Sequence, residues 1–287
     1  MIAAVVRSLR PRQWTKNLLV AAAPLAAGSL FDTPVWWQTL VAFVAFCGLS
    51  GAVYLVNDVV DVESDRAHPR KRLRPIAAGE LSERTALVVA TVLGVASIAA
   101  GTAVNWHLGV LLLSYAVLQA AYSLWLKHEP VFDLAVVSIG FLMRAVAGGL
   151  AAGLPLSDFF LMVAGFGSLF MVAGKRYAEM MLAERTGAKI RKSLESYSAS
   201  YLRYIWSLSA TVMIMTYSLW AFEIRETHHN TVWSVISIVP FVIAVLRYAV
   251  DVDSGNGGAP EEIAFRDHVL QVLGLAWAVS LGLGYYL

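Results

Sequence analysis

The sequence predicts an all-α, polytopic membrane protein that forms a single domain over residues 1–287. The first observation is composition: 58% of the 287 residues are hydrophobic and 15% are charged, whereas soluble domains are about one quarter charged. The second is that the charges are clustered, leaving apolar runs of about 18 residues or more, which can cross a bilayer as helices. The single cysteine, Cys47, excludes a disulfide framework and a cysteine-based metal site.

Nine apolar spans are the predicted transmembrane helices. Their period is helical and no alternating barrel pattern is present, so helices are expected to satisfy the backbone in lipid. In chain order the spans cover residues 17–33, 37–57, 84–104, 107–126, 131–152, 157–175, 204–223, 231–250 and 267–287.

The segments before and between the spans indicate how the helices are connected. Cations precede the first span, and "RPRQW" resembles an interfacial segment, so we expect an uncleaved helix and not a signal peptide. The short turns "NWH" and "KHEP" join the third, fourth and fifth spans as antiparallel neighbours. Charged loops follow the second and sixth spans, at about 58–83 and 175–203, and the glycine-rich "DVDSGNGGAP" before the ninth span is a predicted flexible connector.

The distribution of Lys and Arg predicts the orientation. If the N-terminus is cytoplasmic, nearly all of the 22 Lys and Arg residues fall on the cytoplasmic side, where membrane proteins carry an excess of these residues. Arg225 falls on the other side, and Arg144 lies inside the fifth span. We therefore expect a multi-pass protein of the cell membrane whose two charged loops face the cytoplasm.

The segment "NDVVDVESD" after the second span is the main candidate site. Asp58, Asp61 and Asp65 are spaced i, i+3 and i+7, so on one helix they would share a face, with Asn57 beside it and Glu63 pointing away. Carboxylate oxygens are ligands that Mg²⁺ prefers, usually together with substrate phosphates and water. The other interpretation is a solvated helix end whose acids pair with nearby Arg and Lys.

The basic segment "RAHPRKRLRP" follows at once. A metal-binding stripe beside Arg66, Lys71 and Arg74 suits a polyphosphate, because the metal bridges its oxygens and the cations neutralise the remaining charge. Other cations of the segment, such as Arg70, are explained as well by membrane topology or by anionic lipid headgroups.

Two further places carry candidate phosphate contacts. Lys175, Arg176, Tyr177 and Glu179 fall at the cytoplasmic end of the sixth span, where Glu179 is also a candidate metal ligand, although Lys175 and Glu179 could merely pair as i, i+4 neighbours. Arg144 is costly inside a membrane helix and normally faces a polar cavity or a partner. We expect it to reach a substrate phosphate or an acid, and structural ion pairing is the alternative.

Taken together, these motifs are similar to a known family. "NDVVDVESD" fits the N-D-x-x-D-x-x-x-D signature of the UbiA superfamily of intramembrane prenyltransferases. The resemblance implies nine helices around a central cavity that opens towards the membrane, with Mg²⁺ and a diphosphate held on the signature aspartates. The chain departs from the family after the sixth span, where "KRYAEMMLAE" replaces the usual D-x-x-x-D motif.

The departure, together with "RPRQWTKN" and "DRAHPRKRLRPIAAG", resembles the actinobacterial branch of this superfamily that acts on decaprenyl phosphate. That resemblance implies Mg²⁺-dependent transfer of 5-phosphoribosyl from 5-phosphoribose 1-diphosphate to decaprenyl phosphate. The expected product is decaprenylphosphoryl-5-phosphoribose, used for cell-wall arabinan, and homotrimers are expected. The implied residues are the metal ligands Asp58, Asp61 and Asp65, the donor-binding Lys16, Asn57, Arg66, Lys71, Arg74, Lys175, Arg176, Tyr177 and Glu179, and the acceptor-binding Asn17 and Arg144.

Two other functions stay open on the sequence alone. One is conventional transfer of a prenyl group from prenyl diphosphate to an aromatic or other acceptor, against which the cation-rich second loop argues. The other is a non-enzymatic membrane carrier, although carriers usually place their polar residues near the bilayer midplane on broken helices. A nucleic-acid partner is not expected.

Overall fold

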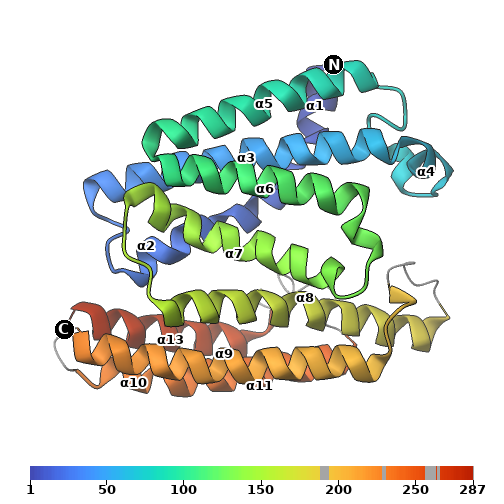
Figure 1. Ribbon diagram of the computed structural model, residues 1–287. Coiled ribbons are helices and arrows are strands. Elements are labelled where there is room, and N and C mark those ends of the chain that lie inside the picture. Colours follow the sequence, from blue (N-terminus) through green and yellow to red (C-terminus); the bar gives the residue numbers. More distant parts are fainter. Residues whose placement is uncertain (188–193, 228–230, 256–262, 264–265, 287) are drawn as a thin grey trace. The chain divides into compact units, whose positions relative to one another are not determined.

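The computed structural model describes residues 1–187, 194–227, 231–255, 263 and 266–286. Within that part of the chain all regular elements are helices, which confirms the predicted all-α class (Figure 1). Eight of them are long and apolar enough to cross a membrane. They are α3 (Thr33–Val60), α5 (Glu83–Val104), α6 (Trp106–Leu124), α7 (Phe132–Ala152), α8 (Asp158–Thr186), α9 (Ala199–Thr227), the continuous pair α10 (Trp233–Ile236) and α11 (Ile238–Asp253), and α13 (His268–Tyr286).

The first predicted span, 17–33, is not confirmed as a spanning helix. The chain begins with α1 (Ile2–Ser8), continues as the 3-10 helix η1 (Pro11–Ala21) and ends this region with the short α2 (Ala22–Ala26). Pro24 lacks a backbone N–H and Gly28 has a φ of +67°, so a regular helix cannot run on through this segment. The count of nine and the side of the N-terminus therefore stay predictions.

The helix α8 extends well beyond its predicted end at residue 175. It continues to Thr186 and ends at Gly187, whose φ of +66° is the left-handed conformation that commonly closes a helix. The first part of the predicted loop 175–203 is therefore helical, and α9 begins at Ala199. Lys189 and the rest of 188–193 lie outside the described residues, as does most of the predicted connector after Asp253.

The chain divides into two compact units. The first unit comprises Met1–Trp125 and Met143–Pro155, and the second comprises Leu126–Leu142 and Leu156–Leu287. In the first unit α3 packs against α5 and α6, which lie side by side in Figure 1. In the second unit α8 packs against α9 and α11.

Two predicted helix boundaries of the first unit have clear local causes. Ser82 precedes α5, and its Oγ accepts a hydrogen bond from the Thr85 N–H at 3.1 Å, which caps the helix. Asn105 ends α5 and begins α6, and its Oδ1 accepts a hydrogen bond from the His107 N–H at 3.0 Å. The "NWH" turn is thus a single capping residue between neighbouring helices, as its brevity predicts.

Candidate functional site

The three aspartates of the signature do not share one continuous helix. Asp58 lies in the last turn of α3, Asp61 forms the junction, and Asp65 lies in α4 (Val62–Ala67). The helical backbone path still continues across the junction, since the Asp65 N–H donates to the Asp61 carbonyl oxygen at 2.9 Å. Asp58 and Asp65 are 2% and 1% exposed. Asp58 and Asp65 are therefore both buried, and the helix is interrupted at Asp61 between them.

Arg74 joins the two buried carboxylates of the stripe. Its Nη1 donates to Asp65 Oδ2 at 2.6 Å and lies 3.1 Å from Asp58 Oδ1. This arrangement needs the chain to turn back after α4, which it does through the short 3-10 helix η2 (Lys71–Leu73). Two carboxylates taken out of water need such a counter-charge, because an unpaired buried charge is very costly.

Arg10 is a second cation of this site, and it is absent from the predicted set. Its Nη2 donates to Asp58 Oδ1 at 2.5 Å, and its guanidinium lies 4.7 Å from the centroid of the Tyr54 ring. Arg10 has a φ of +53° and directly precedes Pro11 at the start of η1. The "RPRQW" motif marks this position, but a contact across 48 residues is set by tertiary packing.

The donor atoms at the stripe fit a magnesium ion in part. Asp65 Oδ1 is buried and makes no hydrogen bond, and Lys71 Nζ lies 3.9 Å from it. Among the described residues, no group of three or more His, Cys, Asp or Glu side chains is arranged to hold a metal on its own. An oxygen-only set with few protein ligands is the arrangement in which Mg²⁺ takes its other ligands from phosphate and water.

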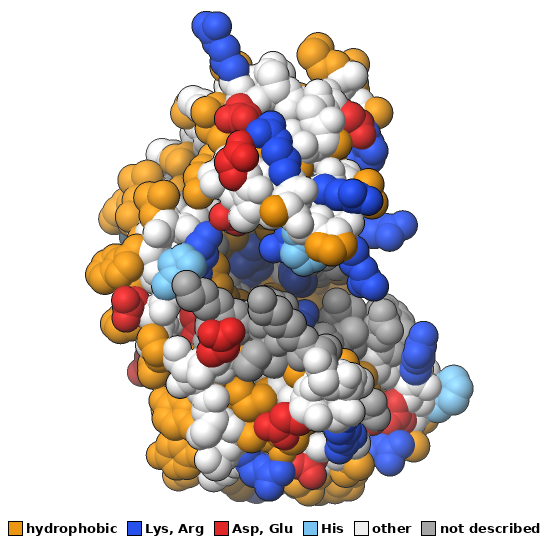
Figure 2. Space-filling view, turned by 90° about the vertical axis from the view of Figure 1, so that its right-hand side faces the viewer, with side chains coloured by type: hydrophobic (Ala, Val, Ile, Leu, Met, Phe, Trp, Pro, Cys, Tyr) orange, Lys and Arg blue, Asp and Glu red, His pale blue; other side chains and the backbone are white. Residues whose placement is uncertain are grey.

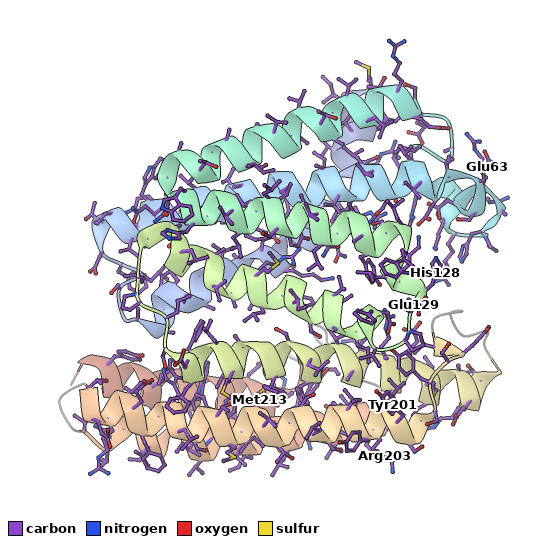
Figure 3. All side chains as sticks on the ribbon, in the orientation of Figure 1. Glu63, His128, Glu129, Tyr201, Arg203 and Met213 are labelled. Atoms are coloured by element: carbon purple, nitrogen blue, oxygen red, sulfur yellow. The ribbon has the colours of Figure 1, made fainter. Side chains whose placement is uncertain are left out.

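The remaining predicted donor-binding residues of the first unit have different surroundings. Arg66 pairs with Glu63 at 2.7 Å, and Glu63 lies on the outer side of α4 (Figure 3). Asn57 accepts a hydrogen bond through its Oδ1 from the Ser123 hydroxyl, which links α3 to α6. Lys16 is half-buried on η1. Figure 2 faces the end of this unit that carries α4, where acidic and basic side chains lie intermixed.

Arg144 and Asn17 meet in the interior of the first unit. The Arg144 Nε donates to Asn17 Oδ1 at 2.8 Å, and its Nη2 donates to the Tyr115 hydroxyl oxygen at 2.7 Å. Asn17 in turn donates to Ser50 Oγ at 3.3 Å. Ser50 is eight positions before Asp58 on α3, which corresponds to a depth of about 12 Å along the helix. The predicted acceptor-binding pair is therefore brought together, in a buried polar network below the stripe.

The predicted residues of the second unit lie on α8. Arg176 is 8% exposed, and its Nη1 is 3.7 Å from Glu179 Oε2. Lys175 is half-buried. Tyr177 is fully buried: its hydroxyl oxygen accepts from Arg203 Nε at 3.1 Å, and the hydroxyl donates to Asp253 Oδ1 at 3.3 Å. Tyr177 therefore ties α8 to α9 and α11; Figure 3 labels Arg203 on α9.

The second unit also contains a buried acid that the sequence reasoning missed. Asp133, in the first turn of α7, is 1% exposed and accepts a hydrogen bond from the Tyr197 hydroxyl through its Oδ1. Its Oδ2 lies 3.9 Å from Arg176 Nε. Burial and the bond to Asp133 raise the pKa of Tyr197, so the tyrosine stays a neutral hydrogen-bond donor. The sequence does contain a signal for Asp133, because it is an ionisable residue inside the apolar span 131–152.

Comparisons with known proteins agree with this architecture. A model described as the UbiA prenyltransferase family matches residues 18–269. The chain is 54% identical over 286 residues to the decaprenyl-phosphate phosphoribosyltransferase of Mycobacterium tuberculosis, covering 98% of this chain and 94% of the relative. It is 51% identical over 294 residues to the enzyme of the same name from Corynebacterium glutamicum, covering 99% and 87%.

A solved structure supports the fold. A UbiA homologue from Archaeoglobus fulgidus, bound to GPP and Mg²⁺, superposes with a TM-score of 0.69 at 16% identity, covering 98% of each chain. The match to the family model and the curated relatives agree with the signature and its helical setting: the chain belongs to the UbiA prenyltransferase family.

Proposed function

We propose that this chain transfers the 5-phosphoribosyl group from 5-phosphoribose 1-diphosphate to decaprenyl phosphate, releasing diphosphate. The observation that carries the proposal is the 54% identity, over 98% of the chain, to a relative named decaprenyl-phosphate phosphoribosyltransferase. The buried acid stripe with its cations supports it, since these residue types suit a metal-bound polyphosphate donor. The product would be decaprenylphosphoryl-5-phosphoribose, a precursor of cell-wall arabinan.

The stripe is assigned to the metal and the leaving diphosphate. Asp58, Asp61 and Asp65 would hold Mg²⁺, which when bound would stabilise the charge that develops on the diphosphate. Arg74 lies within hydrogen-bond distance of two of these carboxylates, so it is placed to neutralise phosphate oxygens beside them. Further donor-phosphate contacts are assigned to a larger set within each unit: Lys16, Asn57, Arg66 and Lys71 in the first, and Lys175, Arg176, Tyr177 and Glu179 in the second.

The transfer itself requires little acid–base chemistry from the protein. An oxygen of the lipid phosphate attacks C1 of the ribose while the bond from C1 to the diphosphate oxygen breaks, which inverts C1. The attacking phosphate is already anionic near neutral pH, so no general base is needed. Arg144 and Asn17 are assigned to the lipid phosphate, because an arginine buried in a membrane helix commonly marks a substrate path.

The location and assembly follow from the same proposal. The excess of Lys and Arg on one predicted side supports a position of the acid stripe at the cytoplasmic face of the cell membrane, where a water-soluble donor and a lipid acceptor would meet. A homotrimer is the assembly that the resemblance implies. Mass measurement of the protein in detergent tests it, and a monomeric mass would contradict it.

Prenyl transfer to an aromatic or other acceptor is the second candidate. It is favoured by the family description, UbiA prenyltransferase, and by the fold shared with a homologue bound to GPP. The cations of α8 and the basic segment after α4 argue for the first candidate. A donor that carries a 5-phosphate in addition to its diphosphate, together with a phosphorylated acceptor, has more negative charge than a prenyl diphosphate has. A non-enzymatic carrier is the third candidate.

The deciding experiment uses purified protein in detergent, radiolabelled 5-phosphoribose 1-diphosphate and decaprenyl phosphate, with either Mg²⁺ or EDTA. We expect label in the organic phase with Mg²⁺ alone. Asp58→Asn and Asp65→Asn should each lower the rate by about 100-fold or more, because they remove charge from the metal site. Glu63→Gln is the matched control, since this acid of the same segment is exposed and pairs with Arg66.

Parallel reactions separate the candidates. Transfer to 4-hydroxybenzoate from a prenyl diphosphate, without phosphoribosyl transfer, would establish the second candidate in place of the first. Absence of both reactions, and of Mg²⁺-dependent diphosphate release, would leave the carrier. An unchanged rate in Asp58→Asn would remove the stripe from the reaction even if transfer occurs.

A further inference from the structure

The start of α7 has an unusual backbone conformation. Val131 has a φ of +71°, in the left-handed region that β-branched residues rarely adopt. Its N–H donates to the Tyr197 hydroxyl oxygen at 2.5 Å. Strain of this kind persists where the surrounding contacts over-determine the conformation, and it often accompanies functional sites. The question is therefore what these contacts hold in place.

The contacts lead through Tyr197 to a buried charge pair. The Tyr197 hydroxyl accepts from Val131 and donates to Asp133 Oδ1. The other oxygen, Asp133 Oδ2, is 3.9 Å from Arg176 Nε, and neither of these two buried atoms makes a hydrogen bond. Buried polar atoms are nearly always hydrogen-bonded, so an exception requires an explanation. Asp133 Oδ2 and Arg176 Nε are two such exceptions, and they are neighbours.

We propose that Asp133 and Tyr197 are positioning residues, which together orient the Arg176 guanidinium for phosphate binding. The inference rests on the proposed function, in which Arg176 contacts a phosphate. Asp133 attracts the Nε side of the guanidinium, and Tyr197 fixes the rotation of the Asp133 carboxylate. The two Nη atoms then form the edge that is available to a phosphate, with Glu179 Oε2 3.7 Å from Nη1.

The geometry explains why the pair is not tightened into a full hydrogen bond. A direct hydrogen bond from Nε to Asp133 would use one of the donors of the Arg176 guanidinium. A separation of 3.9 Å keeps the electrostatic attraction that orients Arg176 and leaves its donors available. A purely structural role for Asp133, as an acid in the first turn of a helix, would need neither Tyr197 nor Arg176.

The test compares Asp133→Asn, Tyr197→Phe and the control Tyr201→Phe. Tyr201, labelled in Figure 3, is an exposed tyrosine of α9. Its ring stacks on that of Tyr197 with 5.8 Å between the centroids, so it matches the chemistry of the change without the contact to Asp133. We expect the first two variants to raise the KM for 5-phosphoribose 1-diphosphate by about tenfold, because misplacing a substrate-binding group by a fraction of an ångström is costly. The kcat should change much less, and Tyr201→Phe should match the wild type. Asp133→Glu should recover part of the KM loss.

A double-mutant cycle separates positioning from folding. In an Arg176→Gln background, Asp133→Asn should raise the KM no further, because the residue that it positions is gone. An additive effect in that background, or an unchanged KM with a lowered Tm in Asp133→Asn and Tyr197→Phe, would overturn the proposal. The Kd of inorganic diphosphate, measured by calorimetry in the same variants, provides a readout that does not require turnover. If the wild type shows no phosphoribosyl transfer, the proposed function fails, and this Kd series still decides whether Asp133 acts through Arg176.

Discussion

The Nη1 atom of Arg74 donates a hydrogen bond to Asp65 Oδ2 at 2.6 Å, although that carboxylate is only 1% exposed. Arg74 thus provides the counter-charge for the Asp65 carboxylate, which is buried at its position on α4. Arg74→Ala should lower the free energy of unfolding by about 3 kcal/mol, because it leaves a buried carboxylate with less compensation. Thermal unfolding in detergent measures the effect.

Arg70→Ala is the matched control for that measurement. Arg70 lies in the same basic segment, four residues earlier, and is exposed, so its removal should leave the Tm unchanged within error. Equal effects of the two substitutions would mean that the segment acts through its net charge and not through the pairing of Arg74 with the stripe.

The contact between Arg144 and Tyr115 should be measurable as a coupling energy. Arg144→Met leaves the Tyr115 hydroxyl and Asn17 Oδ1 short of a buried donor, and Tyr115→Phe removes one acceptor of the guanidinium. Because the two side chains share one network, we expect the double variant to differ from additivity by about 1 kcal/mol or more in unfolding free energy. Additive effects would show that the hydrogen bond contributes nothing to stability.

The strain at Val131 predicts an unusual response to glycine. The left-handed conformation costs a non-glycine residue about 1–2 kcal/mol, and glycine adopts it without this cost. The gain offsets the roughly 0.5–1 kcal/mol that glycine costs through backbone entropy. We therefore expect a Tm equal to or above that of the wild type.

Val136→Gly, one turn further along α7, is the comparison. Val136 is 3% exposed, so its truncation should cost more than about 2 kcal/mol through the cavity that it leaves. If Val131→Gly destabilises the protein as much as Val136→Gly does, the backbone at Val131 is not strained in solution.

Stability at low pH should depend on Asp267, which precedes α13. The hydrogen bond from Arg247, followed by those from the Leu270 and Val269 N–H groups, lowers the pKa of Asp267 in the folded protein. A lowered folded-state pKa means that the charged carboxylate stabilises the fold at neutral pH. That contribution begins to fade near the unfolded-state pKa of about 4 and disappears as the pH falls through the folded-state value.

The variant Asp267→Asn isolates this contribution from those of other acids. It should lower the Tm at pH 7, and the difference from the wild type should shrink as the pH is lowered below about 4. The series of Tm values against pH for the two proteins measures it. A difference that is constant with pH would mean that the Asp267 charge is not coupled to folding.

Sequence reasoning located the helices better than it located their ends. The interiors of α5, α6 and α7 follow from apolar length alone, and the boundary at Asn105 follows from a short polar turn. The end of α8 was wrong by about three turns, because Lys175, Arg176 and Glu179 are charged yet helical. They are buried or half-buried, and Arg176 lies 3.9 Å from Asp133 on α7. Hydropathy measures the residue type and takes no account of such a partner.

The candidate site shows the same division. The spacing of Asp58, Asp61 and Asp65 within eight residues identifies the stripe, since contacts within about two helical turns are encoded locally. The partners Arg10 and Arg74 were not assigned to particular carboxylates by any local pattern. Arg10 is 48 residues away from Asp58 in the sequence, so this contact depends on the packing of η1 against α3.

The sequence by itself therefore determined the class of the protein, the eight helices of the described chain that are long and apolar enough to cross a membrane, and the signature that gives the family. These features depend on length, composition and short-range spacing, which are properties of the chain that do not require any tertiary contact. The tertiary structure alone decided that Arg74 bridges two carboxylates, that Arg144 meets Asn17 and Tyr115, and that Asp133 lies between Tyr197 and Arg176. Pairings of this kind depend on which helices pack together and at what depth, and the free energy that selects them is distributed over many contacts remote in sequence.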